Sequence, residues 1–161
     1  MPLESILVPV DGSSPSLAAL EHAVVLAEDG GASIHILHVD AADELGLATE
    51  AQDEIAEALD AAIDQAIARL GKRVSRRDVS GDPLRTIVET ARDGQHDLIV
   101  IGTHGRIGRL HELLGSVAEG VVRNAPCPVL TVREPGGGYQ SFAERRHGRP
   151  SVSEPTPHHP R

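Results

Sequence analysis

Residues 97–117 read DLIVIGTHGRIGRLHELLGSV, and this stretch decides how the chain folds. It opens with the apolar run 98–101, which is typical of a strand buried on both faces of a parallel sheet. Glycines then recur up to a new apolar-periodic segment that begins at Gly115-Ser116. Glycine lets the backbone approach an anion closely, and the first amide groups of a helix point toward such a charge. The stretch therefore predicts a phosphate-binding loop between a strand and a helix.

The composition indicates one acidic domain that is poor in aromatic residues. The chain has 161 residues, of which Phe, Tyr and Trp supply 1%, so we expect a core of Ala, Val, Ile and Leu. Residues 1–133 carry 21 acidic and 11 basic side chains, and they lack the basic surface and stacking platform of a nucleic-acid binder. No apolar run approaches the roughly 18 residues of a membrane span, and the first residues do not resemble a signal peptide. We expect a cytoplasmic protein that binds neither nucleic acid nor a membrane.

Strand and helix patterns alternate along the chain. Apolar runs bounded by glycine, proline or aspartate predict strands at 3–10, 33–39, 74–79, 98–101 and 129–133, the polar third one near a sheet edge. Helical periodicity predicts helices from Ser13-Ser14-Pro15 to Gly30 and at 50–70, 83–91 and 115–124. In the second helix we assign the buried stripe to Ile55, Leu59, Ile63, Ile67 and Leu70. This alternation predicts an α/β fold with an open, doubly wound parallel sheet.

The last 28 residues differ in composition from the rest. Residues 134–161 hold 5 of the 11 prolines and a run of three glycines, with scattered Arg, Ser and His. They have too little apolar surface to offset the entropy lost on ordering. We therefore expect one domain at 1–133 and a disordered Pro/Gly-rich tail at 134–161.

The glycine loop has the spacing G-x2-G-x9-G-S, formed by Gly102, Gly105, Gly115 and Ser116. It is not the P-loop that ends in Gly-Lys-Ser/Thr, because the chain's one lysine is Lys72, and the dinucleotide fingerprint G-x-G-x-x-G fails at its first spacing. Ligands on doubly wound sheets bind beyond the carboxyl ends of the strands. Two strand ends carry a suggestive sequence, Asp11-Gly12-Ser13 and the glycine loop. If the two strands are neighbours, the loops face each other across one crevice.

With this motif the chain resembles the universal stress proteins of the ATP-binding type, a family marked by G-x2-G-x9-G-[S/T]. The likeness runs over most of residues 3–133. It includes ILVPVDGS at 6–13, His38-Val39 at the end of the second strand, GDP at 81–83 and APCPVLTVR at 125–133.

This resemblance implies a five-stranded sheet in the order 3-2-1-4-5, Rossmann-like and of the adenine nucleotide alpha-hydrolase-like type. It implies ATP, with or without Mg²⁺, at the point where the strand order reverses. Asp11 would face the ribose or adenine, and Val39 would line the adenine pocket. Pro9 also belongs to the expected nucleotide-binding residues. The phosphates would be wrapped by Gly102, His104, Gly105, Gly115, Ser116 and Val117. Arg106, a cation inside the loop, is the arginine we expect to meet a phosphate.

Each of these residues also has a plainer interpretation. Asp11 precedes glycine and suits a turn, Val39 suits a core, and His104 suits a solvated loop. His35 and His38 fall on opposite faces of one strand and cannot jointly bind a metal, and His158-His159 suits a solvated tail, so we expect no metal site.

The resemblance and the loop chemistry together predict a regulator. A phosphoryl-transfer enzyme needs a base, a metal clamp and a cation on the transferred group, and this loop has no lysine. We expect a stress-response sensor that binds ATP with slow or negligible hydrolysis and acts on unidentified protein partners. The alternatives are a slow ATP hydrolase or phosphotransferase using the same pocket, and an interaction module that needs no nucleotide. The family resemblance further implies a homodimer that pairs through the last strand, Val129 to Val132.

Overall fold

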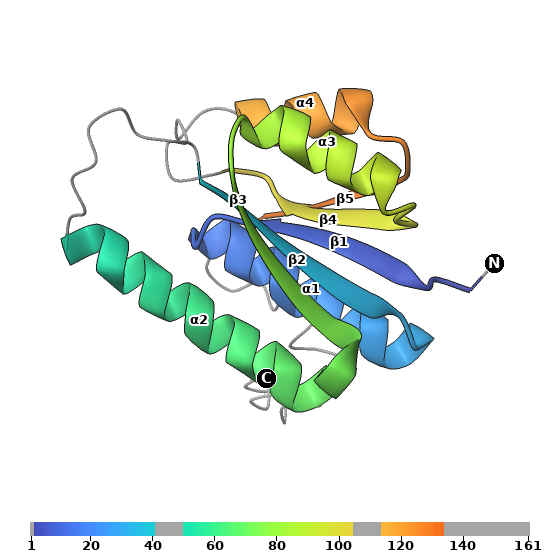
Figure 1. Cartoon of the computed structure of the whole chain (residues 1–161), viewed down its shortest axis with the longest axis horizontal. Coiled ribbons are helices and arrows are strands. Elements are labelled where there is room, and N and C mark those ends of the chain that lie inside the picture. Colours follow the sequence, from blue (N-terminus) through green and yellow to red (C-terminus); the bar gives the residue numbers. More distant parts are fainter. Residues whose placement is uncertain (1, 41–49, 105–113, 134–161) are drawn as a thin grey trace, which may run out of the picture.

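The computed structural model describes residues 2–40, 50–104 and 114–133, which form a three-layer α/β fold (Figure 1). A parallel five-stranded sheet in the order β3-β2-β1-β4-β5 forms the middle layer. This confirms the predicted fold class and strand order. The strands are β1 (Ser5–Val10), β2 (Ser33–Asp40), β3 (Val74–Ser80), β4 (Leu98–Gly102) and β5 (Val129–Val132).

Helices cover both faces of the sheet. The core residues of α1 (Ser14–Gly30) and α2 (Glu50–Leu70) pack against one face, and those of α3 (Pro83–Asp93) and α4 (Ser116–Asn124) pack against the other. Figure 1 shows the two helix pairs on opposite sides of the sheet. A short 3₁₀ turn, η1 (Gly71–Arg73), connects α2 to β3.

The central position of β1 in the sheet explains why its sequence is apolar without alternation. Ile6 and Val8 point toward α1 and α2, whereas Leu7 points toward α3 and α4. Each of the three is 1% exposed or less, because helices cover both faces of the sheet. The buried hydrophobic residues of the described part of the chain are all Ala, Val, Ile or Leu, as the composition predicts.

The predicted stripe of α2 is wrong at Ile67, and its first member, Ile55, is only partly buried. Ile67 is 44% exposed, and the buried residues of the helix are Leu59, Ile63, Ala66 and Leu70. A step of four residues overshoots a full helical turn by about 40°, so a strict four-residue repeat drifts off the face after three steps. The buried set alternates steps of four and three, which keeps it facing α1 and the sheet.

The strand order places a reversal point between β1 and β4. From β1 the chain moves outward to β2 and β3 on one side, and β4 and β5 lie on the other side. β3 is exposed at five of its seven residues, as expected for the polar strand at one edge, and β5 forms the other edge among the described strands. The carboxyl ends of β1 and β4 therefore flank the crevice at which doubly wound folds bind ligands.

Candidate functional site

The turn after β1 is built by the carboxylate of Asp11. The backbone amide of Ser13 donates to Asp11 Oδ1 at 2.9 Å, and the Ser13 hydroxyl donates to the same oxygen. Between them Gly12 has φ of 80°, and a Cβ there would lie 2.3 Å from the side chain of Ile55 on α2. Asp11 thus has the turn-forming role that its sequence also suggested, and glycine is required beside it.

The turn after β1 contacts the loop after β4. The Ser13 hydroxyl oxygen, whose hydrogen is directed chiefly to Asp11, lies 3.5 Å from the carbonyl oxygen of His104. Gly102, two residues before His104, packs closely on the start of α1. A Cβ on Gly102 would lie 2.6 Å from the carbonyl carbon of Pro15 and 2.8 Å from the amide nitrogen of Ser16. Gly102 therefore allows the end of β4 to approach the start of α1. The turn after β1 and the end of β4 with His104 therefore lie side by side, as predicted for neighbouring strands.

The start of α4 is tied to the same loop. The amide of Gly115 donates to the carbonyl of Thr103 at 2.5 Å, and the Gly115 carbonyl accepts the first bond of the helix from Glu119. Gly115 is the N-cap residue and makes no side-chain cap hydrogen bond. Because the first amides of a helix have no acceptor within the helix, this start presents donors toward the crevice.

The three helix starts that follow β1, β3 and β4 differ in how they are capped. α3 is closed by Asp82, whose Oδ1 accepts from the amide of Arg85 at 2.8 Å. The N-cap residue of α1, Ser13, makes no such bond, because its hydroxyl is directed to Asp11 and His104. The two helix starts without a side-chain cap, α1 and α4, are the two that flank the crevice.

The other predicted residues lie at or near this edge of the sheet. His104 is partly buried, and its Nδ1 lies 3.0 Å from the Thr103 hydroxyl. Val39 and Val117 both pack against the core on the α3 and α4 side of the sheet. Pro9 is buried in β1, in register with Leu37. Ser116 is exposed at the first position of α4. Gly105 and Arg106 lie outside the described residues.

The sequence did not predict the roles of two residues that hold the site together, although it marked Ser13 as part of the turn after the first strand. Ser13 joins the two loops, and Thr103, which is 3% exposed, joins the loop after β4 to two further elements. The Thr103 amide donates to Val132 of β5, and its carbonyl accepts from Gly115 before α4. The sequence feature that could have indicated this linking role is a threonine placed between the last residue of a strand and a glycine of the following loop.

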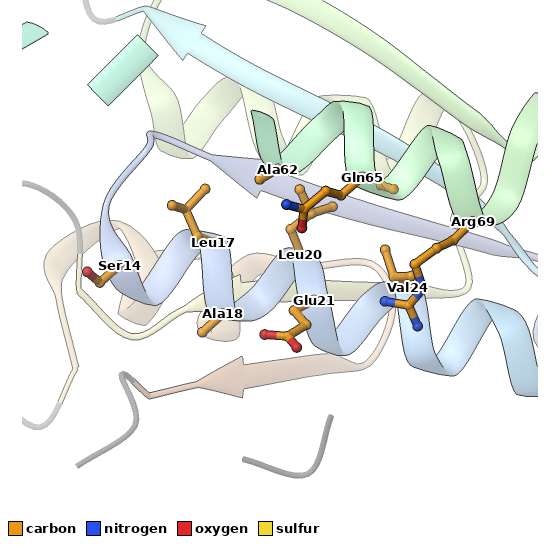
Figure 2. Close-up of a pocket in the computed structure, with 10 residues that line it drawn as sticks. Ser14, Leu17, Ala18, Leu20, Glu21, Val24, Ala62, Gln65 and Arg69 are labelled. Carbon is orange, nitrogen blue, oxygen red and sulfur yellow. The ribbon is translucent and has the colours of Figure 1, made fainter. Parts of the chain in front are cut away.

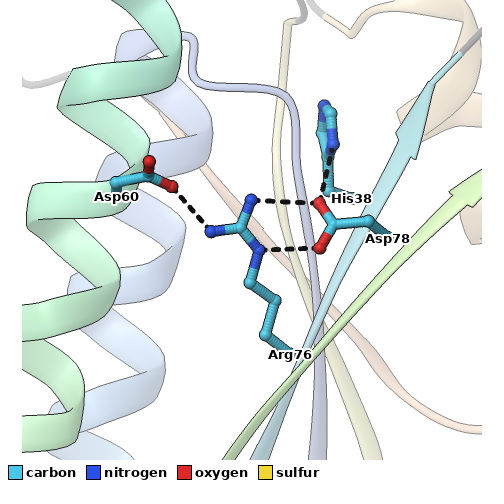
Figure 3. Close-up of polar contacts among 4 residues, drawn as sticks. All are labelled: His38, Asp60, Arg76 and Asp78. Atoms are coloured by element: carbon cyan, nitrogen blue, oxygen red, sulfur yellow. Dashed lines mark hydrogen bonds and ion pairs between the residues drawn. The ribbon is translucent and has the colours of Figure 1, made fainter.

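The strongest ionic cluster lies away from the crevice. Arg76 of β3 donates to both carboxylate oxygens of Asp78, and its other nitrogen lies 2.6 Å from Asp60 of α2 (Figure 3). His38 Nδ1 lies 3.2 Å from the same Asp78. The hydrogen bonds from Arg76 lower the pKa of Asp78, and those of both carboxylates raise the pKa of Arg76. This cluster fastens α2 to the polar edge strand.

The two histidines of β2 have separate partners. His38 contacts Asp78, whereas His35 Nδ1 lies 2.8 Å from the hydroxyl of Ser75. Over residues 2–40, 50–104 and 114–133, no three His, Cys, Asp or Glu side chains converge as metal ligands do. In the same ranges, no helix combines the length and apolarity needed to cross a bilayer.

Comparison with known proteins identifies the family. The sequence model of the Universal stress protein family matches residues 2–133. The chain belongs to this family. Universal stress protein MJ0531 of Methanocaldococcus jannaschii is 38% identical to this universal stress protein over 141 residues, covering 82% of this chain and 83% of the relative. The predicted family is therefore confirmed.

Two solved structures of the family resemble this universal stress protein throughout the domain. A universal stress protein in complex with cAMP is 29% identical to this chain and has a TM-score of 0.65. The match covers 84% of this chain and 100% of the chain in that complex. The universal stress protein of Archaeoglobus fulgidus in complex with dAMP is 26% identical, covers 82% and 99%, and has a TM-score of 0.59. Both are complexes with adenine nucleotides that carry one phosphate.

Proposed function

We propose that this universal stress protein binds ATP in the crevice between the carboxyl ends of β1 and β4 and acts in the cytoplasm as a nucleotide-dependent stress regulator. The observation that carries the proposal is that the two helix starts without a side-chain cap, those of α1 and α4, both lie against the end of β4. The Ser13 hydroxyl reaches the His104 carbonyl at 3.5 Å, and the Gly115 amide reaches Thr103 at 2.5 Å. An anion bound there would be stabilised by the first amides of α4 and by the positive end of its helix dipole.

The residues around that point fit the parts of ATP. The amides of Ser116 and Val117 and the Ser116 hydroxyl suit phosphate oxygens, and the loop with Gly102, His104, Gly105 and Arg106 would complete the cradle. On the other side, the Asp11 carboxylate suits ribose hydroxyls, and the apolar surface of Val39 and Pro9 suits the base. Mg²⁺ would be bound chiefly by the phosphates, since this ion retains several waters and needs few protein ligands.

The solved complexes support an adenine nucleotide as the ligand. The relatives bound to cAMP and dAMP share the sheet and helix order with this chain over more than four fifths of its length. Arg106, which precedes α4 in the sequence, would supply a cation for the further phosphates that ATP carries. ATP is therefore the ligand that we propose, with mononucleotides as the competing ligands.

The first test is to identify the ligand of the purified protein. We expect nucleotide released on denaturation to be ATP at nearly one per chain, and titration calorimetry of nucleotide-free protein to rank ATP above AMP and cAMP. Tighter binding of a mononucleotide would replace ATP in the proposal. No released nucleotide and no binding of the three would favour an interaction module that needs no nucleotide. ATP turnover above roughly 1 per second would favour a hydrolase.

We further propose that two copies pair through β5. In this strand the carbonyls of Pro128 and Val132 accept bonds from the β4 side, so the backbone groups of Val129 and Thr131 point outward from the sheet edge. Leu130 adds a side chain that is 38% exposed. Thr131→Pro removes one outward amide and no amide of the ladder to β4. We expect light scattering to give a dimer for the wild type and a monomer for this variant, and a wild-type monomer would contradict the pairing.

A further inference from the structure

We propose that the C-terminal tail of this protein folds back and seats its aromatic residues, Tyr139 and Phe142, in the groove between α1 and α2. This α1–α2 groove is lined by Leu17, Leu20, Glu21, Val24, Ala62 and Ala66 among others. Figure 2 shows Leu17 and Leu20 of α1 pointing toward Ala62 and Gln65 of α2. The proposal concerns a surface separate from the crevice at the end of β4.

Small side chains create the groove. α2 presents Ala62 and Ala66 to α1, and these short side chains leave space beside Leu17, which is only partly buried, whereas Leu20 forms the buried floor. The resulting cavity measures about 360 Å³, which lies at the small end of the range of about 300–1,000 Å³ found for ligand pockets. This volume suits one or two side chains of the segment that fills it, and it is small for a whole nucleotide. Aromatic rings are the side chains that gain most free energy from such burial.

The groove lies in the most acidic layer of the molecule. α1 and α2 together carry nine acidic side chains and one arginine, a net charge of −8 within a domain, residues 1–133, whose net charge is −10. That arginine, Arg69, is paired with Glu28, with Nε to Oε1 at 2.8 Å. The field at the groove therefore favours an occupant that is apolar at its tip and basic beside it.

The tail of this chain has that chemistry. It contains the only tyrosine and the only phenylalanine of the protein, Tyr139 and Phe142, and the sequence has no tryptophan. Arg145, Arg146 and Arg149 follow directly, so residues 139–149 carry three arginines and one glutamate, a net charge of +2. Aromatic residues that are absent from the core and gathered beside a basic cluster are typical of a docking segment. Such a segment orders on contact, which agrees with the disorder that its composition predicts in isolation.

The tail also begins at the right place. β5 ends at Val132, which is in register with Gly102, and the Gly102 backbone packs on Pro15 and Ser16 in the first turn of α1. Ser14, in the same turn, lines the groove. The six Cα-to-Cα steps from Arg133 to Tyr139 can span up to about 20 Å. Helix α1, with 17 residues, is about 25 Å long. Tyr139 and Phe142 can therefore reach the groove, and their tethering gives an effective concentration of the order of millimolar.

Tyrosine fluorescence of the full-length chain tests the proposal, because Tyr139 is its only tyrosine and no tryptophan masks it. We expect acrylamide to quench Tyr139 less in the native chain than in the same chain in urea. Glu21→Arg reverses a charge in the groove and is expected to weaken docking about fivefold, which raises the quenching constant. Glu57→Arg is the matched control, since Glu57 is an exposed residue of α2 that does not line the groove, and it should leave quenching near the wild-type value.

A charge exchange makes the test specific. Arg145→Glu in the Glu21→Arg background should restore protection of Tyr139, and Arg145→Glu alone should lower it. Quenching in the native wild type equal to that in urea would overturn the proposal. Protection that responds equally to the Glu21 and Glu57 variants would also overturn it, because the tail would then dock elsewhere. Protection that disappears on dilution would show that the tail enters the groove of a second copy, which would overturn the intramolecular proposal.

Discussion

The backbone amides at the two ends of the strands find their acceptors in different ways. We call the side at which the strands begin the amino edge of the sheet, and the side at which they end the carboxyl edge. At the amino edge the carboxylate of Asp97 accepts the amides of Glu4 and Ser5 at 3.0 and 2.9 Å, and the Ser5 hydroxyl lies 2.6 Å from His96 Nδ1. At the carboxyl edge the starts of α1 and α4 have no side-chain cap. A side chain thus accepts the amides at the amino edge, whereas at the carboxyl edge α1 and α4 begin without a bond from the side chain of the N-cap residue.

This difference is not a general property of helix starts in the molecule. α3 also begins at the carboxyl edge, but it begins after the edge strand β3 and is capped by Asp82. The uncapped starts follow β1 and β4, where the strand order reverses. This difference agrees with the proposal above, in which contacts at the amino edge serve stability and the uncapped starts at the carboxyl edge serve ligand binding.

The largest effect is expected from Gly115→Asp, which gives α4 the kind of cap that α3 has. A carboxylate at this N-cap would occupy the donors and repel phosphate, so ATP affinity should fall at least about 100-fold. The free energy of unfolding should stay the same or rise by a few tenths of a kcal/mol, since aspartate caps slightly better than glycine. Titration calorimetry and urea unfolding measure the two quantities.

Two matched variants sharpen this prediction. Gly115→Asn caps without a charge and should lose less affinity than Gly115→Asp. Asp82→Ala removes the cap of α3 and should cost about 1 kcal/mol of stability with no change in ATP affinity. ATP binding by Gly115→Asp at wild-type strength would contradict a phosphate site at the start of α4.

The reverse pattern is expected at the amino edge. Asp97→Ala leaves the amides of Glu4 and Ser5 without their charged acceptor, so the free energy of unfolding should fall by about 1–3 kcal/mol. Nucleotide affinity should not change. Asp93→Ala, at an exposed position of α3, is the control and should change stability by less than about 0.5 kcal/mol. A loss of nucleotide affinity in Asp97→Ala with stability intact would break the comparison between the edges.

A smaller effect should appear as pH dependence at His96. Burial lowers the pKa of this imidazole, and the nearby His35 lowers it further, while Asp97 opposes both. The folded protein thus holds His96 neutral at pH values where the unfolded chain binds a proton. Its contribution to stability is complete above the ordinary pKa of about 6.5 and is lost as pH falls through the lower folded-state value. His96→Asn should therefore show a shallower fall of unfolding free energy from about pH 7.5 to 5; parallel curves would contradict the assignment.

The smallest effect is expected from Asp78→Asn, which lies within the edge strand β3 and not at the amino or carboxyl ends of the strands. Arg76 lowers the pKa of Asp78, so the ion pair contributes above the ordinary pKa of that carboxyl and is lost as pH falls through its lowered value. Because the Asp78 side chain is 51% exposed, solvent screening should limit the change in unfolding free energy to less than about 1 kcal/mol at pH 7. Thermal unfolding at low and high salt should show the difference shrinking with salt. A larger effect would mean that this cluster, and not the amino edge, anchors the fold.

The sequence by itself determined where the helices and strands of this protein lie, because the residues that end or begin them are clear in it. Asp82-Pro83 marks the start of α3, and the polar pattern of residues 74–79 marks an edge strand, both of which the structure has. The family resemblance then supplied the strand order. Local spacing could not supply it, since the same apolar runs suit several arrangements of a parallel sheet.

Only the tertiary structure decided which residues hold the crevice together. Ile67 fits the helical repeat but is exposed, because the face of α2 is defined by α1 and the sheet and not by the helix alone. Gly102 suggested close approach to a ligand, yet its measured neighbours are Pro15 and Ser16, 86 or more positions away in the chain. Ser13 meets His104 for the same reason. Such contacts depend on β1 and β4 being neighbours, and pairing between distant segments leaves no local signal in the sequence.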